Sequence, residues 1–186
     1  MNKTEAIKML IKYPFQILKD GIRMQEQKDY QKQLKTKYGL NQLPTIDLLD
    51  LFPDLDETVS PYSFLSGTSL ITDLALLKLL ARKQKGGSYL EIGSWRGESI
   101  ANVNDVLEDC VSVTLSEKEM QAYGFSNDFI KVHGIFSKDC NYEAHGHDSK
   151  TFDFTSLNKK FDLIFIDGDH SYGGVLNDTQ KILPLL

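Results

Sequence analysis

The sequence has few of the features that mark disulfide-rich, zinc-ribbon or membrane proteins. It contains only two cysteines, Cys110 and Cys140, far apart and outside any C-x-x-C pair. This argues against a zinc ribbon or a redox dithiol and favours reduced, buried thiols. No apolar run approaches the roughly 20 residues of a membrane-spanning helix, and the best N-terminal stretch, 9–18, is broken by Lys12 and Pro14. We therefore expect a cytoplasmic protein without a transmembrane segment.

Charge is distributed unevenly along the 186 residues. Residues 1–40 hold nine Lys and Arg against four Asp and Glu, whereas the remainder holds twelve against twenty-two. The body of the chain is therefore acidic and repels polyanions, so we expect no nucleic-acid substrate. The basic N-terminal segment is suited to contact a partner or an anionic surface. With 41% apolar residues, the chain is long enough to bury a core.

The N-terminal part of the chain is predicted to be a helical extension. Apolar side chains recur at helical spacing within residues 4–38, and we expect Pro14 and Gly21 to interrupt the helix. The apolar stripe is expected to dock on the rest of the chain or on a second subunit. A proline-punctuated stretch follows, and the apolar residues 70–80 predict another helix.

From residue 88 the pattern changes to short apolar runs separated by helical stretches. This alternation is typical of βαβ units around a parallel sheet. The predicted fold class is α/β, with a Rossmann-like open sheet of strand order 3-2-1-4. We assign the helical extension to residues 1–64 and the Rossmann-like domain to residues 65–186. The predicted strands are 89–93, 111–115, 142–146 and 163–167.

Two glycines, Gly93 and Gly97, bracket the turn after the first predicted strand. Without Cβ atoms the backbone can bend sharply there and approach a ligand, which indicates a cofactor loop. In a dinucleotide fingerprint a glycine makes room for the pyrophosphate, but here that position is Trp95, which disfavours a nicotinamide-dependent oxidoreductase. Glu91 is placed to hold a cationic amine, the partner that a buried carboxylate needs. The alternative is a glycine-rich turn with a structural tryptophan.

Polar residues after the second and third strands are candidates for contact with a nucleotide. Glu117 has nearly the spacing of acids that bind ribose hydroxyls, although it also fits the acid-rich first turn of a helix. Asp148 and Ser149 follow the third strand and are candidates for an adenine contact. His145 and His147 have the H-x-H spacing of metal ligands, but no further ligand lies nearby in sequence.

Three chemically active side chains, Asp167, Asp169 and His170, follow the fourth strand. That strand neighbours the first one across the switch point where open α/β sheets bind ligands. Two carboxylates at this spacing can converge on one cation, and His170 can join them or act as a neutral base. The alternative is an Asp-Gly turn that caps the following helix.

Together these residues resemble the class I S-adenosylmethionine-dependent methyltransferases. The resemblance is to the subgroup whose cofactor loop reads E-I-G-x-W-x-G-x-S and whose fourth strand ends in I-D-G-D-H-x-Y. Both motifs occur, at residues 91–99 and 166–172, and the resemblance covers about residues 65–186. It implies S-adenosylmethionine as cofactor. The predicted cofactor-binding residues are Glu91, Gly93, Ser94, Trp95, Gly97, Ser99, Glu117, Asp148 and Ser149.

The resemblance also implies a reaction: methyl transfer to an oxygen of a small-molecule acceptor, with a sugar hydroxyl as one candidate. It gives Asp167, Asp169 and His170 a substrate-facing, catalytic role. Some related subgroups hold magnesium with strand-four acids, so Asp167 and Asp169 are also candidate metal ligands. A non-catalytic cofactor-binding or regulatory module with the same fold is the alternative.

Two features depart from the family pattern. The second strand ends in Leu115-Ser116-Glu117, without an acid directly at its tip, which leaves the ribose contact open. Family members continue with a fifth strand and an antiparallel pair, whereas this sequence stops one helix after the fourth strand. We therefore expect strand four to be an exposed edge or to be covered by another chain. The chain would then be an incomplete, weakly active fragment, or it would form a homo-oligomer through this edge or the N-terminal helices.

Overall fold

The computed structural model describes residues 3–186, and the chain divides into two compact units, 1–54 and 55–186. The second unit thus includes residues 55–64, which we assigned to the extension. Several long-range hydrogen bonds tie this segment to later helices, as two examples show. Lys78 donates from Nζ to the Thr58 oxygen at 2.8 Å, and the Ser60 N–H donates to Oδ1 of Asn102 at 2.9 Å. Sequence patterns do not reveal such contacts.

The first unit is helical, with α1 at Lys3–Lys12, α2 at Pro14–Tyr38 and α3 at Leu48–Leu51. The break before Pro14 occurs as predicted, but the predicted interruption at Gly21 is wrong, because Gly21 lies inside α2. A glycine costs a helix interior only about 1 kcal/mol relative to alanine, which a helix of 25 residues can absorb. None of the helices within residues 3–186 is long and apolar enough to cross a membrane.

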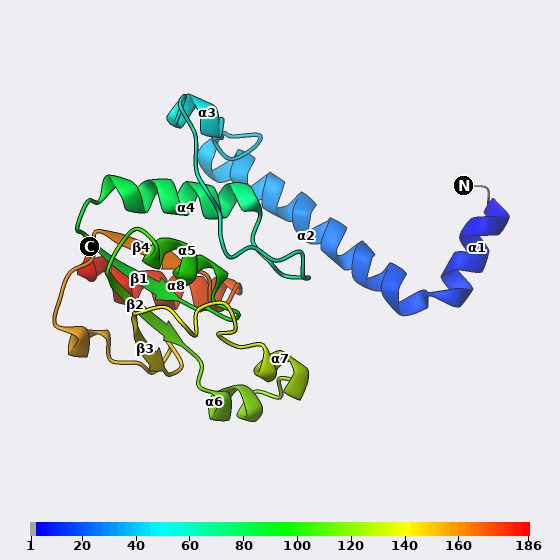
Figure 1. Cartoon of the computed structure of the whole chain (residues 1–186). Helices are drawn as coiled ribbons and strands as arrows, with labels where there is room; N and C mark the ends of the chain where they lie inside the picture. Colours follow the sequence, from blue (N-terminus) through cyan, green and yellow to red (C-terminus); the bar gives the residue numbers. More distant parts are fainter. Residues whose placement is uncertain (1–2) are drawn as a thin grey trace. The chain divides into compact units, whose positions relative to one another are not determined.

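The second unit is built on a four-stranded parallel sheet of order β3-β2-β1-β4, the predicted Rossmann-like arrangement (Figure 1). Pairing is in register from Ser88 opposite Asp109, and from Tyr89 opposite Leu163. The strands are β1 Ser88–Ile92, β2 Asp109–Thr114, β3 Glu143–Gly146 and β4 Leu163–Ile166. The helices are α4 Ile71–Lys83, α5 Glu98–Asn104, α6 Glu117–Ala122, α7 Asn127–Lys131 and α8 Tyr172–Ile182, with short 3-10 turns η1 Phe154–Leu157 and η2 Leu183–Leu185.

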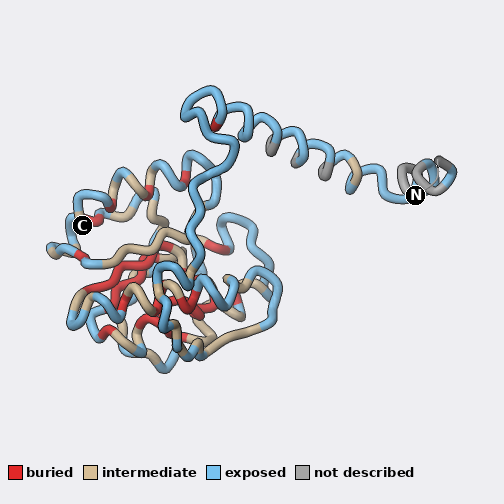
Figure 2. Tube along the Cα trace, turned by 90° about the horizontal axis from the view of Figure 1, so that it is seen from above, coloured by how far each residue is buried: buried red, intermediate tan, exposed pale blue. Residues whose placement is uncertain are grey.

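Alternate residues of the central strands enter two separate cores, because successive side chains of a strand point to opposite faces. Tyr89 packs with residues of α4 and α5, such as Leu77 and Ile100. Leu90 packs on the other face with Ile182 of α8. The central strands are accordingly the most buried part of the second unit (Figure 2).

The strands β1 and β4 differ in how far they are covered. All five residues of β1 are buried, whereas the four residues of β4 are only partly buried. Within the described sheet β4 is the outer strand next to β1, so its second edge has no strand partner among residues 3–186. Both cysteines are free; Cys110 is buried as expected, but Cys140 is only partly buried.

Candidate functional site

A cavity of about 480 Å³ opens at the carboxyl ends of β1, β2 and β4. Open α/β sheets bind ligands at this edge, and small-molecule sites have volumes of roughly 300–1,000 Å³. Apolar side chains such as Val113, Leu115 and Met120 form part of its wall. Seven residues of the predicted site line it: Gly93, Trp95, Asp148, Ser149, Asp167, Asp169 and His170.

A second cavity, of about 330 Å³, shares part of this lining. Gly93, Trp95, Asp167 and His170 belong to both cavities, so the two spaces meet at the turns after β1 and β4. The second cavity adds two further members of the predicted set, Ser94 and Ser99, together with Gly67 and Ser69 from the segment before α4.

The two motif glycines are required by close backbone packing and by their own conformation. Gly93 has φ +86°, and a Cβ there would lie 2.6 Å from both the Asp167 oxygen and the Gly168 Cα. Gly97 also has φ +86°, and its Cβ would lie 2.6 Å from Cβ of Ser137. Side chains are therefore excluded at both positions, and the turn after β1 packs directly against the turn after β4.

Trp95 begins a row of aromatic rings that borders both cavities. Its ring stacks on Phe129 at a centroid distance of 4.6 Å, and Phe129 stacks on Phe125 at the same distance. Trp95 has φ +28°, a left-handed conformation that costs a bulky residue conformational energy. Its Nε1 is buried and has no hydrogen-bond partner among the described residues. Buried donors without partners are rare, so this one marks the junction as unusual.

Glu91 is fully buried in β1 and lines neither of these two cavities. The hydroxyls of Tyr89 and Ser99 donate hydrogen bonds to its carboxylate at 2.6 and 2.8 Å. Burial raises the pKa of Glu91 from 4.5 to about 7, against the opposing effect of these hydrogen bonds. The predicted contact between Glu91 and a cationic amine stays a prediction, since the structure pairs the carboxylate with hydroxyls.

The acidic residues after β2 lie in the first turn of α6. Ser116 and Glu119 form a capping box, in which each side chain bonds to the other residue's backbone N–H. Glu117 is the first residue of α6 and lies outside the lining of both cavities. The structure therefore does not bring Glu117 together with the other predicted cofactor residues.

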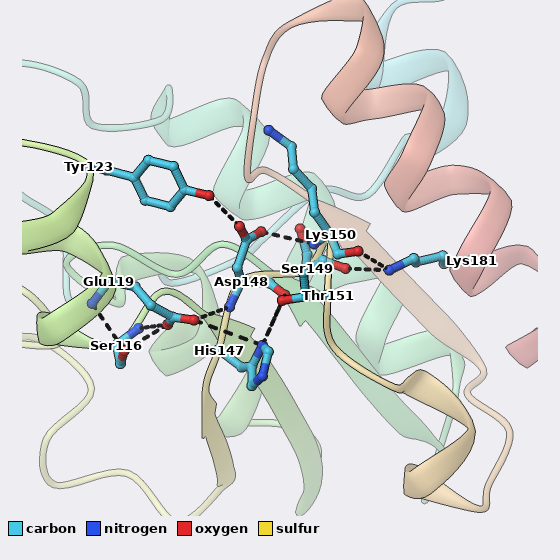
Figure 3. A network of polar contacts seen from close by, with 9 residues as sticks. All are labelled: Ser116, Glu119, Tyr123, His147, Asp148, Ser149, Lys150, Thr151 and Lys181. Atoms are coloured by element: carbon cyan, nitrogen blue, oxygen red, sulfur yellow. Dashed lines mark hydrogen bonds and ion pairs between the residues drawn. The ribbon is translucent and has the colours of Figure 1, made fainter.

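Asp148 lies at the centre of a polar network after β3 (Figure 3). Its carboxylate accepts from the Tyr123 hydroxyl at 2.5 Å and from the Lys150 backbone N–H at 2.9 Å. Its own N–H donates to Oε1 of Glu119 at 3.1 Å. These contacts fix the Asp148 carboxylate at the cavity wall.

Two lysines hold the residues that follow Asp148, and Figure 3 shows the contacts of the first of them, Lys181. Lys181 of α8 donates from Nζ to the backbone oxygens of Ser149 and Lys150, at 3.0 and 2.5 Å. Nζ of Lys150 lies 2.8 Å from Oδ2 of Asp169, so an ion pair links the loop after β3 to the loop after β4. The hydrogen bond from Lys150 lowers the pKa of Asp169 to about 2, which keeps that carboxylate charged.

Asp167 pairs with His170 in the loop after β4. Nε2 of His170 lies 3.2 Å from Oδ1 of Asp167, and the imidazole is 77% exposed. Desolvation raises the pKa of Asp167, although the neighbouring imidazole opposes this shift. A carboxylate beside an imidazole can orient the ring and fix which of its nitrogens is free to accept a proton, as a general base requires.

The predicted magnesium site at Asp167 and Asp169 finds no support. The two carboxylates are engaged by different side chains, Asp167 by His170 and Asp169 by Lys150. Within residues 3–186, the described side chains form no group of three or more His, Cys, Asp or Glu suited to a metal ion. His145 is paired instead with Glu143, Nε2 to Oε1 at 2.7 Å.

Several site residues were not predicted from the sequence. Tyr123, Lys150, Phe125 and Phe129 all line the first cavity. Glu119, which accepts a hydrogen bond from the N–H of Asp148, is the one neighbour of the site with a readable signal. The S-x-x-E pattern at the start of α6 is the sequence signature of a capping box. The others reach the cavity through loop conformations that no local pattern encodes.

Comparison with known proteins identifies the family of this chain. A family model described as a methyltransferase domain matches residues 90–186, more than half of the chain. The chain therefore belongs to this family of methyltransferase domains. A search of curated protein sequences gives no match.

Solved structures with similar folds include three methyltransferases. An SAH-bound methyltransferase from Podospora anserina shares 22% identity, with 64% of this chain and 50% of that chain covered and a TM-score of 0.45. An O-methyltransferase from Bacillus cereus in complex with SAH shares 20%, with coverages of 84% and 67% and a TM-score of 0.43. A sugar N-methyltransferase from Streptoalloteichus shares 15%, with coverages of 70% and 56% and a TM-score of 0.42. The chain thus spans half the length of the first of these proteins.

Proposed function

We propose that this chain transfers the methyl group of S-adenosylmethionine to an oxygen of a small molecule, with a sugar hydroxyl as the first candidate acceptor. Membership of the methyltransferase family supports the reaction class. The observation that carries the proposal is the Asp167–His170 pair, which borders both cavities where they meet. A base at that junction can reach an acceptor beside a bound cofactor.

The residues of the two cavities suit the proposed cofactor. Apolar Leu115 and Met120 can cover the faces of a purine, and the fixed carboxylate of Asp148 can accept a hydrogen bond from its amino group. The buried Nε1 of Trp95, which has no partner among the described residues, would be satisfied by an acceptor on a ligand. We assign the nucleoside end to the first cavity, and the amino-acid end to the second, where Ser69, Ser94 and Ser99 lie.

The proposed mechanism assigns the proton to His170. When bound, the sulfonium group supplies an already activated methyl, so the remaining tasks are alignment and removal of the acceptor's proton. A hydrogen bond donated by Nε2 to Asp167 leaves Nδ1 of His170 as the proton acceptor. Asp167 then stabilises the imidazolium that forms. No step is routed through a metal, since Asp169 is held by Lys150.

The experiment is to incubate the chain with methyl-labelled S-adenosylmethionine and a panel of sugars and phenols. We expect label in at least one hydroxylated acceptor, and loss of that product with His170→Asn. Binding of the cofactor without transfer to any acceptor would favour the non-catalytic module instead. A cytoplasmic location, and association through residues 4–38 or the β4 edge, stay predictions.

A further inference from the structure

Arg96 is a buried residue of the cofactor loop with no role in the account above. Its side chain is 3% exposed. Nη1 donates to the backbone oxygen of Ser66 at 3.0 Å, and Nη2 donates to Oγ1 of Thr68 at 2.6 Å. Arg96 thereby joins the loop after β1 to the segment 63–69, which lies before α4 and outside the motif.

Glu98 completes this connection from the first turn of α5. Nε of Arg96 lies 3.4 Å from Oε2 of Glu98, and Oε1 of Glu98 accepts from Ser63 at 2.5 Å and from Thr68 at 3.2 Å. A buried ion pair contributes little net stability, because desolvation offsets most of the attraction. The charged pair is therefore better explained by the geometry it imposes on the segment 63–69 than by the free energy it adds.

The same guanidinium also lies over the indole of Trp95, with Cζ 4.0 Å from the ring centroid. Gly67 packs against that indole so closely that a Cβ there would lie 2.8 Å from Cζ3 of Trp95. Trp95 keeps a left-handed backbone, which persists only where its surroundings hold it. Arg96 contacts both the indole and the segment that carries Gly67.

We propose that Arg96 is a positioning residue, which holds Trp95 and the segment 63–69 together as one wall of the second cavity. Trp95, Gly67 and Ser69 all line that cavity, and Arg96 itself also belongs to its lining. The inference rests on the proposed function, in which this cavity receives the amino-acid end of the cofactor. This positioning role requires the planar guanidinium of arginine, because its three nitrogens donate to three acceptors in different directions.

The test compares Arg96→Lys with Arg82→Lys, measuring SAH binding by calorimetry. Arg82 is the control, since its guanidinium is likewise held by hydrogen bonds, two of them to the carboxylate of Glu57, but lines neither cavity. We expect SAH affinity to fall on the order of 10- to 100-fold with Arg96→Lys and to stay unchanged with Arg82→Lys. With an acceptor, the KM for S-adenosylmethionine should rise more than kcat falls.

Trp95 supplies a second readout, because it is the only tryptophan in the chain. Its emission should shift in Arg96→Lys without ligand, but not in Arg82→Lys. If Arg96→Lys fails to fold, Thr68→Val removes the hydroxyl that accepts from Nη2 while keeping the side-chain shape, and should weaken SAH binding in the same way.

The outcomes separate this inference from the proposed function. Wild-type affinity for SAH in folded Arg96→Lys or, where that variant does not fold, in Thr68→Val would overturn the positioning role and leave the proposed function intact. Absence of SAH binding by the wild-type chain would overturn the proposed function, and this inference with it.

Discussion

A Cβ atom on Gly93 would lie 2.6 Å from the backbone oxygen of Asp167. The turn of the cofactor loop and the turn that carries the candidate base are therefore packed backbone against backbone. Any change that separates them alters the junction of the two cavities, because Gly93 and Asp167 both line each cavity. The two sequence motifs thus form a single structural unit.

Gly93→Ala should therefore impair both stability and cofactor binding. Gly86→Ala is a matched control, because Gly86 also has a left-handed φ, +70°, but a Cβ there meets nothing described within 4 Å. The control should lose only about 1–2 kcal/mol of unfolding free energy, the cost of a left-handed backbone at a residue with a Cβ atom. Gly93→Ala should lower the melting temperature further. It should also weaken SAH binding at least tenfold, because even a small displacement of positioned groups is costly. Equal effects of the two substitutions in thermal unfolding and calorimetry would contradict the close-packing argument.

His170→Asn should lower the rate of methyl transfer by a factor of about 10²–10⁴, the usual contribution of general base catalysis. The affinity for SAH should change little, since the imidazole is exposed and acts on the acceptor. His145→Asn is the control, because His145 lines neither cavity. An unchanged kcat in His170→Asn, measured at saturating acceptor, would exclude His170 as the base.

Asp148→Ala should weaken SAH binding by about tenfold or more, the value of a hydrogen bond to a charged group. Asp153→Ala offers a comparison, since Asp153 is also an acid that accepts a nearby backbone N–H, but outside the cavities. Calorimetry should find wild-type SAH affinity in Asp153→Ala. If both variants bind SAH as the wild type does, the purine end is not at Asp148.

Glu91 should make the stability of the chain depend on pH between about 4.5 and 7. Because burial raises the folded pKa from 4.5 to about 7, the folded chain binds more protons than the unfolded chain in this range. The stabilisation is present below pH 4.5 and is lost as the pH rises to about 7, by at most about 3 kcal/mol. Glu91→Gln should remove this dependence. Urea unfolding at pH 5 and pH 8 measures this dependence in the wild type and in Glu91→Gln. The same change in unfolding free energy between the two pH values in both proteins would refute the role of the buried carboxyl group.

The sheet could be predicted from the sequence because its signals are local. Apolar runs bounded by turn residues placed all four strands within a few residues, and the alternation with helices predicted parallel pairing. Gly93 and Gly97 were recognisable because their conformations exclude other residues. The predicted break at Gly21 was wrong, since the weak helix preference of one glycine was outweighed by its neighbours.

The site could be predicted where its residues belong to a motif or directly follow a predicted strand. Arg96 donates to Ser66 and Thr68, which precede it by about thirty residues. Lys150 donates to Asp169, although β2 and β1 separate their strands β3 and β4 in the sheet. Neither contact leaves a periodic or spaced pattern in the sequence. Glu117 has the spacing of a ribose-binding acid, but the capping box places it in the first turn of α6, outside both cavities.

The most direct test of the central claim is a calorimetric titration of the chain with SAH and, separately, with NADH. The cavity at the ends of β1, β2 and β4 should bind one SAH per chain, S-adenosylmethionine should compete for that site, and NADH should give no heat of binding. Tight NADH binding with no response to SAH would contradict the account, because it would assign the loop at Gly93 and Trp95 to a dinucleotide.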